Sequence, residues 1–218
     1  MKVLLLRPEG SEVPQDPEIE IVNIPVLKPV CIPHTLPFMP KTIGFTSVNA
    51  VKCFNYAEVF EKVNEVYAVG PSTANALKDI FNVKQVIVPE TFTVDSMVQK
   101  MLRNSKDKTI LVRSSVGYKR DKEKYPQITQ IVDYDLLINE ENLRKTKQLL
   151  SDCTFNYVII TSSLIATLIK DSLRECTKVV SIGPSTTKAL EGVNNIYEAR
   201  EHDMNGIFIL LKGLLRDD

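Results

Sequence analysis

The octet Gly70-Pro-Ser-Thr-Ala-Asn-Ala-Leu77 recurs as Gly183-Pro-Ser-Thr-Thr-Lys-Ala-Leu190, with six of the eight positions identical. Each copy follows a short β-branched run and opens a stretch with helical periodicity. A second shared element precedes each copy at nearly the same distance, as Ile43-Gly-Phe-Thr-Ser47 and as Val158-Ile-Ile-Thr-Ser162. A long unit that occurs twice is not a solenoid, which is built from shorter units repeated at least three times. The repeat therefore predicts two similar domains, each with hydroxyl-bearing turns between a strand and a helix.

Strands alternate with helices along most of the chain. Short β-branched runs that end in polar, Gly or Pro turns predict strands at 3–7, 19–26, 42–46, 65–69, 85–89, 109–113, 129–137, 157–161, 178–182 and 195–199. Apolar residues at three- and four-residue spacing predict helices at 50–62, 72–81, 93–103, 140–150, 163–173 and 204–215. This alternation is typical of parallel sheets flanked by helices, so the predicted fold class is α/β.

The two copies of the repeat differ in chain order. In the first copy, the Thr-Ser and Gly-Pro-Ser-Thr strands precede the strand that ends at Arg113. In the second copy they come last, and the corresponding strand, which ends at Arg7, lies at the N-terminus. The second domain is then a discontinuous circular permutant, formed by residues 1–30 and 139–218, into which a domain at 38–137 is inserted. The crossings at 31–37 and 134–139 predict a two-stranded hinge with the active-site cleft between the domains.

Length and charge narrow the class of protein. A chain of 218 residues suits one large or two small domains. Hydrophobic residues make up 44% and charged residues 25%, which is an ordinary globular balance. Basic and acidic residues are equal at 27 each, so no overall field attracts nucleic acid or a membrane surface. No apolar run approaches the ~18–20 residues of a membrane span, so we expect neither a nucleic-acid nor a membrane partner.

The N-terminus and the cysteines predict a cytoplasmic protein. Met1 leads directly into an apolar strand that is too short for the core of a signal peptide. The four cysteines, Cys31, Cys53, Cys153 and Cys176, show no CxxC spacing, which argues against a zinc site or a redox motif. We expect them to be reduced thiols.

Hydroxyl side chains dominate the predicted carboxyl ends of the strands, where ligands bind in doubly wound sheets. Two arginines accompany them, and the set is Arg7, Ser47, Ser72, Thr73, Arg113, Ser162, Ser185 and Thr186. The prolines of the two octets suit the first position of a helix, and their Ser and Thr neighbours can cap that helix or leave backbone N–H groups free for an anion. Capping explains any one turn, but a matched pair of octets favours an anion site. The arginines could bind anions or pair with Glu9 or Asp133.

The sequence lacks the motifs of several common kinds of binding and catalytic site. No GxGxxG follows the first strand and no GxxxxGK[ST] occurs, so dinucleotide and P-loop sites are not supported. His34 lies in the Pro-rich crossing and His202 in a Glu-His-Asp turn, and neither suits a nucleophilic triad. Two histidines without clustered carboxylates also make a poor metal site. We therefore expect no metal and no cofactor.

Short motifs in a fixed order cover the whole chain. They are Leu5-Leu-Arg-Pro8, Phe45-Thr-Ser-Val-Asn-Ala-Val51, the segments 69–77 and 182–190, and a tyrosine, Tyr134, in the strand that returns between the domains. In these residues and their order the chain resembles the uroporphyrinogen-III synthase family. It departs from the family at Arg113-Ser114, where Arg-Gly is frequent, and at Ser163-Leu-Ile165, where a Pro-Ser-Ala-like run is more usual.

The resemblance implies a cyclising hydro-lyase of tetrapyrrole biosynthesis, on the route to haem, sirohaem or cobalamin. Such an enzyme closes hydroxymethylbilane, with inversion of ring D, to uroporphyrinogen III and uses no cofactor. Tyr134 is the implied catalytic group, a weak general acid at the departing hydroxyl. Thr73 and Thr186 are the implied carboxylate-binding threonines, with Ser47 and Ser162 in the adjacent turns.

The resemblance also implies a basic substrate contact at Lys178, although a solvated strand end explains that residue equally well. It further implies a monomer that receives its substrate from hydroxymethylbilane synthase. An alternative function is a hinged two-domain protein that binds a small organic anion without catalysis. A third, an α/β enzyme acting on sugars or phosphates, is disfavoured because acid–base pairs are missing.

Overall fold

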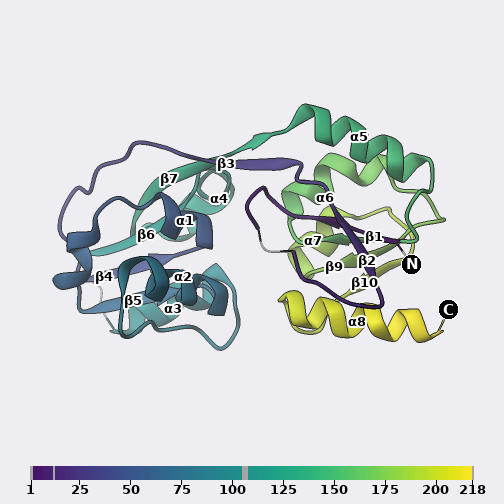
Figure 1. Ribbon diagram of the computed structural model, residues 1–218. Helices are drawn as coiled ribbons and strands as arrows, with labels where there is room; N and C mark the ends of the chain where they lie inside the picture. The colour runs from purple at the N-terminus through teal and green to yellow at the C-terminus, as the bar shows by residue number, and fades with distance from the viewer. Residues whose placement is uncertain (1, 12, 105–107, 218) are drawn as a thin grey trace. The chain divides into compact units, whose positions relative to one another are not determined.

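The computed structural model describes residues 2–11, 13–104 and 108–217. The chain divides into two compact units (Figure 1): unit 1, Met1–Lys28 with Leu137–Asp218, and unit 2, Pro29–Leu136. The sequence predicted that the chain first crosses between the domains between residues 30 and 38, and crosses back between residues 137 and 139. The first boundary lies earlier than expected because the Pro-rich crossing forms a strand, β3 (Leu27–Cys31), beside the returning strand β7 (Thr129–Ile138).

Unit 2 is built on a five-stranded sheet in the order β3-β7-β6-β4-β5. Its remaining strands are β4 (Thr42–Phe45), β5 (Glu65–Ala68) and β6 (Thr109–Ser114), and β4 to β7 pair in parallel. The helices are α1 (Val48–Cys53), η1 (Ala57–Glu61), α2 (Pro71–Phe81), α3 (Val94–Asn104), α4 (Ser115–Asp121) and η2 (Lys122–Lys124). One face of this sheet buries an aromatic cluster around Phe45 and Phe54, and the other buries Tyr67, Met97 and Met101.

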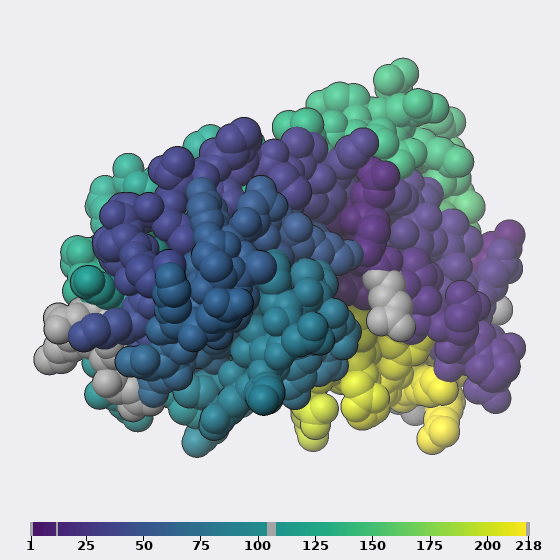
Figure 2. Space-filling view, turned by 60° about the vertical axis from the view of Figure 1, so that its left-hand side comes forward, coloured from purple at the N-terminus to yellow at the C-terminus, as the bar shows by residue number. Residues whose placement is uncertain are grey.

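Unit 1 has a parallel five-stranded sheet in the order β10-β9-β8-β1-β2. Its strands are β1 (Lys2–Leu6), β2 (Glu20–Asn23), β8 (Tyr157–Ile160), β9 (Lys178–Ser181) and β10 (Ile196–Glu198). The helices are α5 (Glu140–Ser151), α6 (Ser163–Ile169), η3 (Lys170–Ser172), α7 (Pro184–Ala189) and α8 (Met204–Asp217). Helix α8 buries Ile207 and Leu211 in the core, while its outer side, with Ile209 62% exposed, reaches the surface (Figure 2).

The strand orders of the two sheets correspond when one of them is circularly permuted. The sheet of unit 1 has the order β10, β9, β8, β1, β2. The corresponding segments of unit 2, in the same order, are the segment at Ile87, β5, β4, β6 and β7. Each unit therefore places its Thr-Ser strand between its Gly-Pro-Ser-Thr strand and the strand that ends at Leu6 or Ser114. The predicted strand at 85–89 is reduced to a single bridge, Tyr67 to Ile87, and the predicted helix at 50–62 is divided into α1 and η1.

The expectation of reduced thiols was wrong. The four cysteines, all within the described ranges, form the disulfides Cys31–Cys53 in unit 2 and Cys153–Cys176 in unit 1. Their Cα–Cα distances of 5.2 and 5.9 Å lie in the usual range for disulfides. Partners 22 and 23 residues apart share no short motif, so spacing alone could not reveal pairs that the fold brings together.

Candidate active site

The carboxyl edge of the unit 2 sheet gathers the hydroxyl groups that the sequence predicted there. Because β4, β5 and β6 are parallel, the turns after them lie at the same edge. Thr46 donates to the carbonyl of Val112 on the neighbouring strand at 3.2 Å, which holds the turn in place. Ser47 then caps α1, accepting a hydrogen bond from the Ala50 N–H at 3.1 Å. Ser47 is thus fixed at the start of a helix and beside the end of a strand.

Tyr134 meets Ser47 across this edge. Its phenol oxygen lies 2.9 Å from Ser47 Oγ, and the side chain is 5% exposed. A β-bulge sets its direction: Arg113 pairs with Val132 and Ser114 with Tyr134, so Asp133 is an extra residue in β7. Burial raises the pKa of the phenol, against the opposing effect of hydrogen bonds with Ser47 and Ser114. The phenol therefore keeps its proton and can donate it or a hydrogen bond.

The bulge residue Asp133 is fully buried, and neither of its carboxylate oxygens has a hydrogen-bond partner among the described residues. Burial raises the pKa of this carboxyl to about 8. A carboxyl in such surroundings is held in its neutral form at pH 7, because removing the charged form from water is costly.

Arg113 pairs with a different acid from the one considered in the sequence. Its side chain is 1% exposed, and its Nη2 lies 2.5 Å from Asp121 Oδ1 in α4. Its Nη1 also donates to Gln130 Oε1 at 2.8 Å. The guanidinium therefore holds α4 against β6 and β7, and its charge is already compensated inside unit 2.

The two octets begin helices in the way the sequence predicted. Neither α2 nor α7 has a side-chain cap, and each has proline in its first turn. Ser72 and Ser185 are exposed, whereas Thr73 and Thr186 are 3% and 1% exposed. The serines are thus the accessible hydroxyls, and the threonines are packed under the first turn.

A ring covers the first glycine of each octet. A Cβ added to Gly70 would lie 3.6 Å from Phe92, and one added to Gly183 would lie 3.0 Å from His202. No role was expected for His202, because no nucleophile pattern lies near it in the sequence. The structure places it at the octet of unit 1, in the position that Phe92 occupies in unit 2. Comparing the segments that follow the two octets could have revealed this correspondence.

The carboxyl edge of unit 1 holds the second group of predicted residues. Thr161 donates to the Leu6 carbonyl at 3.3 Å, as Thr46 does to Val112 in unit 2. Ser162 begins α6 without a side-chain capping bond, and Arg7 follows β1 half-buried. Lys178 is the exception, because it begins β9 at the opposite edge, where its Nζ lies 3.4 Å from the phenol oxygen of Tyr157. The structure does not bring Lys178 to the hydroxyl groups.

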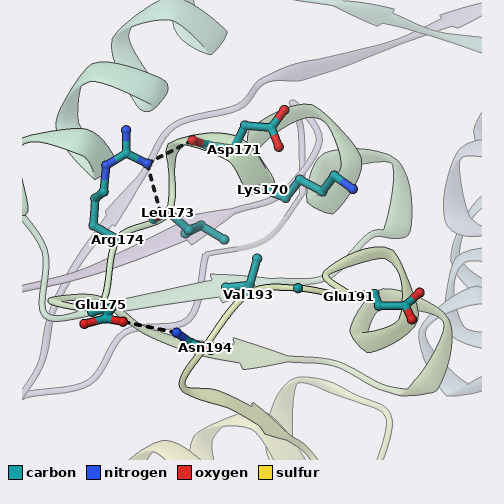
Figure 3. Close-up of a pocket in the computed structure, with 9 residues that line it drawn as sticks. Lys170, Asp171, Leu173, Arg174, Glu175, Glu191, Val193 and Asn194 are labelled. Atoms are coloured by element: carbon teal, nitrogen blue, oxygen red, sulfur yellow. Dashed lines mark hydrogen bonds between the residues drawn. The ribbon is translucent and has the colours of Figure 1, made fainter.

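Cavities lie at the amino-terminal edges, away from the hydroxyl groups. In unit 1, a cavity of about 360 Å³ is formed by the segments that lead into β9 and β10, with Lys170, Arg174, Glu175 and Asn194 among its lining residues (Figure 3). Unit 2 has one of about 920 Å³ at the corresponding place, between η1 and β5 and after α2. None of the hydroxyl turns lines these two cavities, so the candidate site lies at the carboxyl ends of the strands.

Within the described ranges, no cluster of three or more His, Cys, Asp or Glu side chains could hold a metal ion. No helix in the same ranges is long and apolar enough to span a membrane. The absence of a cofactor stays a prediction.

Comparison with known proteins decides the family. The sequence matches the family model described as "Uroporphyrinogen-III synthase HemD" over residues 3–209. The chain belongs to the uroporphyrinogen-III synthase family. This confirms the resemblance and the enzyme class, a cyclising lyase of tetrapyrrole biosynthesis that makes uroporphyrinogen III. Comparison with curated protein sequences finds no significant match.

Solved structures of uroporphyrinogen-III synthases share the fold. The chain is similar to the enzyme from Helicobacter pylori, with a TM-score of 0.61 and 18% identity over 98% of this chain and 100% of that one. It is also similar to a mutant enzyme from Thermus thermophilus, with a TM-score of 0.59 and 13% identity over 100% of this chain and 99% of that one. These likenesses confirm the α/β fold with two mostly parallel sheets.

Proposed function

We propose that this uroporphyrinogen-III synthase closes hydroxymethylbilane mainly by positioning it, with Tyr134 as the group that assists departure of the hydroxyl. The observation that carries this assignment is the Ser47–Tyr134 pair, 2.9 Å apart at the carboxyl edge of unit 2. The raised phenol pKa supports a donor rather than a base, because a protonated phenol can hydrogen-bond to a leaving oxygen.

The reaction needs no protein nucleophile. Loss of the terminal hydroxyl as water leaves an azafulvene, and the substituted carbon of ring D attacks its exocyclic carbon to give a spirocyclic pyrrolenine. The bond from ring D to the bridging carbon of the neighbouring pyrrole then breaks and re-forms at the other α-carbon of ring D, and loss of the proton from that carbon restores the pyrrole with ring D inverted. Holding the reacting carbons together can supply much of the rate, since a well-oriented intramolecular reaction has a high effective concentration.

The substrate bears eight carboxylates, and the octets supply groups that suit them. Backbone N–H groups at the uncapped starts of α2 and α7, together with the exposed hydroxyls of Ser72 and Ser185, are donors to carboxylates. Thr73 and Thr186 support those turns from beneath. Arg7 stays a proposed contact at the unit 1 edge. We leave Lys178 and Arg113 out of the proposed set, because one lies at the opposite edge and the other is paired to Asp121.

The decisive assay uses freshly generated hydroxymethylbilane. The purified protein should convert it to uroporphyrinogen III, whereas the uncatalysed reaction closes without inversion to isomer I. Formation of isomer I alone, at the uncatalysed rate, would contradict the proposal and would favour the anion-binding alternative, which no observation otherwise supports.

A cytoplasmic location, a monomeric state and substrate hand-over from hydroxymethylbilane synthase stay predictions. The two disulfides weigh against the cytoplasmic location, because thiols there are normally kept reduced. Acid-quenched thiol trapping in intact cells would measure the redox state directly, and light scattering would give the oligomeric state.

A further inference from the structure

The disulfide Cys31–Cys53 closes a ring of contacts around Tyr134. Cys53 is the last residue of α1, and Ser47 caps the first turn of the same helix and contacts the phenol. On the other side of the ring, Cys31 ends β3, and the next residue, Ile32, donates its N–H to the Asp133 carbonyl at 2.7 Å. Asp133 directly precedes Tyr134. The disulfide is thus the covalent link between the two segments that hold the phenol and its partner.

Helix α1 depends on such external support. It has six residues, and helices this short are unstable by themselves because few hydrogen bonds offset the cost of nucleation. Ser47 holds its first turn, and Cys53, 4% exposed, holds its last. Contacts of His34 reinforce the same junction: its carbonyl accepts from the Tyr56 phenol at 2.6 Å, and its ring stacks on Phe54 at 6.0 Å between centroids.

We propose that Cys31 and Cys53 are positioning residues for the reaction, and that their disulfide holds Ser47 at the distance at which it orders the Tyr134 phenol. The proposal rests on the function proposed for Tyr134. It adds that catalysis responds to the redox state of this one disulfide, while the second disulfide, in unit 1, has no such effect.

Reduction by a dithiol such as dithiothreitol breaks the S–S bond. The reductant gives up two electrons and two protons and becomes a cyclic disulfide, while Cys31 and Cys53 each become a thiol. Because Cys31 is exposed, a reductant can reach this bond by attack on its sulfur. Reoxidation reverses the change, so the effect is expected to be reversible.

The chain offers a matched control. Cys153–Cys176 joins residues 23 apart, against 22 for Cys31–Cys53, and both of its cysteines are exposed. Loops of similar length constrain the unfolded chain to a similar extent. The variant C153S/C176S, which retains only the unit 2 disulfide, is the working protein, and C31S/C53S is its counterpart.

The first readout is structural and independent of activity. With ¹³Cζ-labelled tyrosine, the chain gives seven signals, and Tyr134→Phe identifies the one from Tyr134. Dithiothreitol should shift the Tyr134 signal in C153S/C176S and should leave it unchanged in C31S/C53S. An unchanged Tyr134 signal in C153S/C176S, with thiol titration proving reduction, would overturn the proposal. Titration of two thiols in that variant before any reductant is added would also overturn it, since the disulfide would not exist.

The second readout is kinetic. Loss of one ordering hydrogen bond corresponds to about a three- to tenfold decrease in kcat, and dithiothreitol should produce it in C153S/C176S, with recovery on reoxidation. Repeating the reduction in C153S/C176S/Y134F should give no further decrease, since the disulfide acts through the phenol. An equal decrease in both backgrounds would overturn the proposal. Full activity of Tyr134→Phe alone would instead refute the proposed role of Tyr134, while the spectroscopic test would still report on positioning.

Discussion

The two units carry the same turns at the same edge of the sheet, yet among the described residues only the serine of the unit 2 turn contacts a phenol. Thr46 and Thr161 make the same bond to a neighbouring strand, and Ser47 and Ser162 follow them in the same place. Ser47 caps its helix and contacts Tyr134, whereas Ser162 makes no side-chain cap. In unit 1 the chain after β2 continues with the apolar residues Ile24, Pro25, Val26 and Leu27. In the proposed mechanism, the same turn is therefore part of a reactive pair in unit 2 and a binding edge in unit 1.

The local cause of this difference is the bulge in β7. The pairing of β6 with β7 shifts register between Arg113 and Ser114, whereas the pairing of β1 with β2 runs without a shift. An extra residue turns the following side chain toward the sheet edge. Unit 2 consequently contains both Tyr134, beside Ser47, and Asp133, buried without a partner among the described residues. The chemical difference between the two units thus arises from one extra residue in β7, in a strand arrangement that the units otherwise share.

The largest expected effect comes from removing the phenol of unit 2. Tyr134→Phe should lower the rate of isomer III formation by ~10–1000-fold, because general acids contribute about 10²–10⁴-fold and water can replace part of that. Isomer I should accumulate, since unprocessed hydroxymethylbilane closes without inversion. Chromatographic separation of the isomers measures both. A rate within twofold of the parent enzyme would place the acid elsewhere.

The next effect concerns the buried carboxyl, which makes stability fall as pH rises. Because the folded-state pKa of Asp133 is raised to about 8 from 3.8, the folded state binds its proton more tightly than the unfolded state. The contribution of this carboxyl to the free energy of unfolding is then complete below about pH 3.8. It decreases up to about pH 8, by roughly 1.4 kcal/mol per pH unit at most. Asp133→Asn should remove this decline.

Urea unfolding at pH 5 and pH 8 measures the effect of Asp133→Asn. The variant should gain stability over the parent by about 2–4 kcal/mol between these two pH values. Asp152→Asn, at an exposed carboxyl, is the control and should change little. Parallel pH profiles for parent and Asp133→Asn would contradict the assignment of a neutral buried carboxyl.

Ser47 and Ser162 occupy equivalent positions in the two units, so replacing each of them tests the comparison of the units most directly. Ser47→Ala removes both a helix cap and the partner of Tyr134, so stability should fall by about 1 kcal/mol and kcat by about tenfold. Ser162→Ala removes no capping bond and should leave stability nearly unchanged, with a smaller effect carried by KM. Thermal unfolding measures the stability of both variants, and steady-state kinetics measure their kcat and KM. Equal losses of kcat would mean that the two edges share the chemistry.

The smallest expected effect distinguishes Phe92 from His202, the side chains whose rings cover the first glycine of each octet. Gly183→Ala places a methyl group 3.0 Å from His202, a close approach, and should cost about 1 kcal/mol of stability. Gly70→Ala meets Phe92 at an ordinary 3.6 Å and should cost less. Both glycines have extended backbones, so strain is not a factor. Recovery of stability in G183A/H202A would confirm the cause, and failure to recover would exclude it.

Much of the site could be predicted because it lies in turns with local rules. Proline followed by Ser-Thr predicts a helix start, and α2 and α7 begin there. Arg113 shows the limit of this reasoning. Lys178 begins β9 as the predicted strand at 178–182 had it, but which acid Arg113 meets depends on how α4 packs against β6. The predicted roles of the hydroxyl groups stay predictions.

The sequence by itself determined the plan: the duplicated octet required two similar α/β units, and the order of the copies required a permutation. Those inferences depend on short-range patterns, whose hydrophobic period and turn residues act within a few positions of one another. Only the tertiary structure decided that Cys31 meets Cys53, that Asp121 neutralises Arg113, and that a bulge turns Tyr134 toward Ser47. These contacts join residues 8 to 87 positions apart (113 to 121, 47 to 134), and their partners are selected by packing and strand register, which no local pattern records.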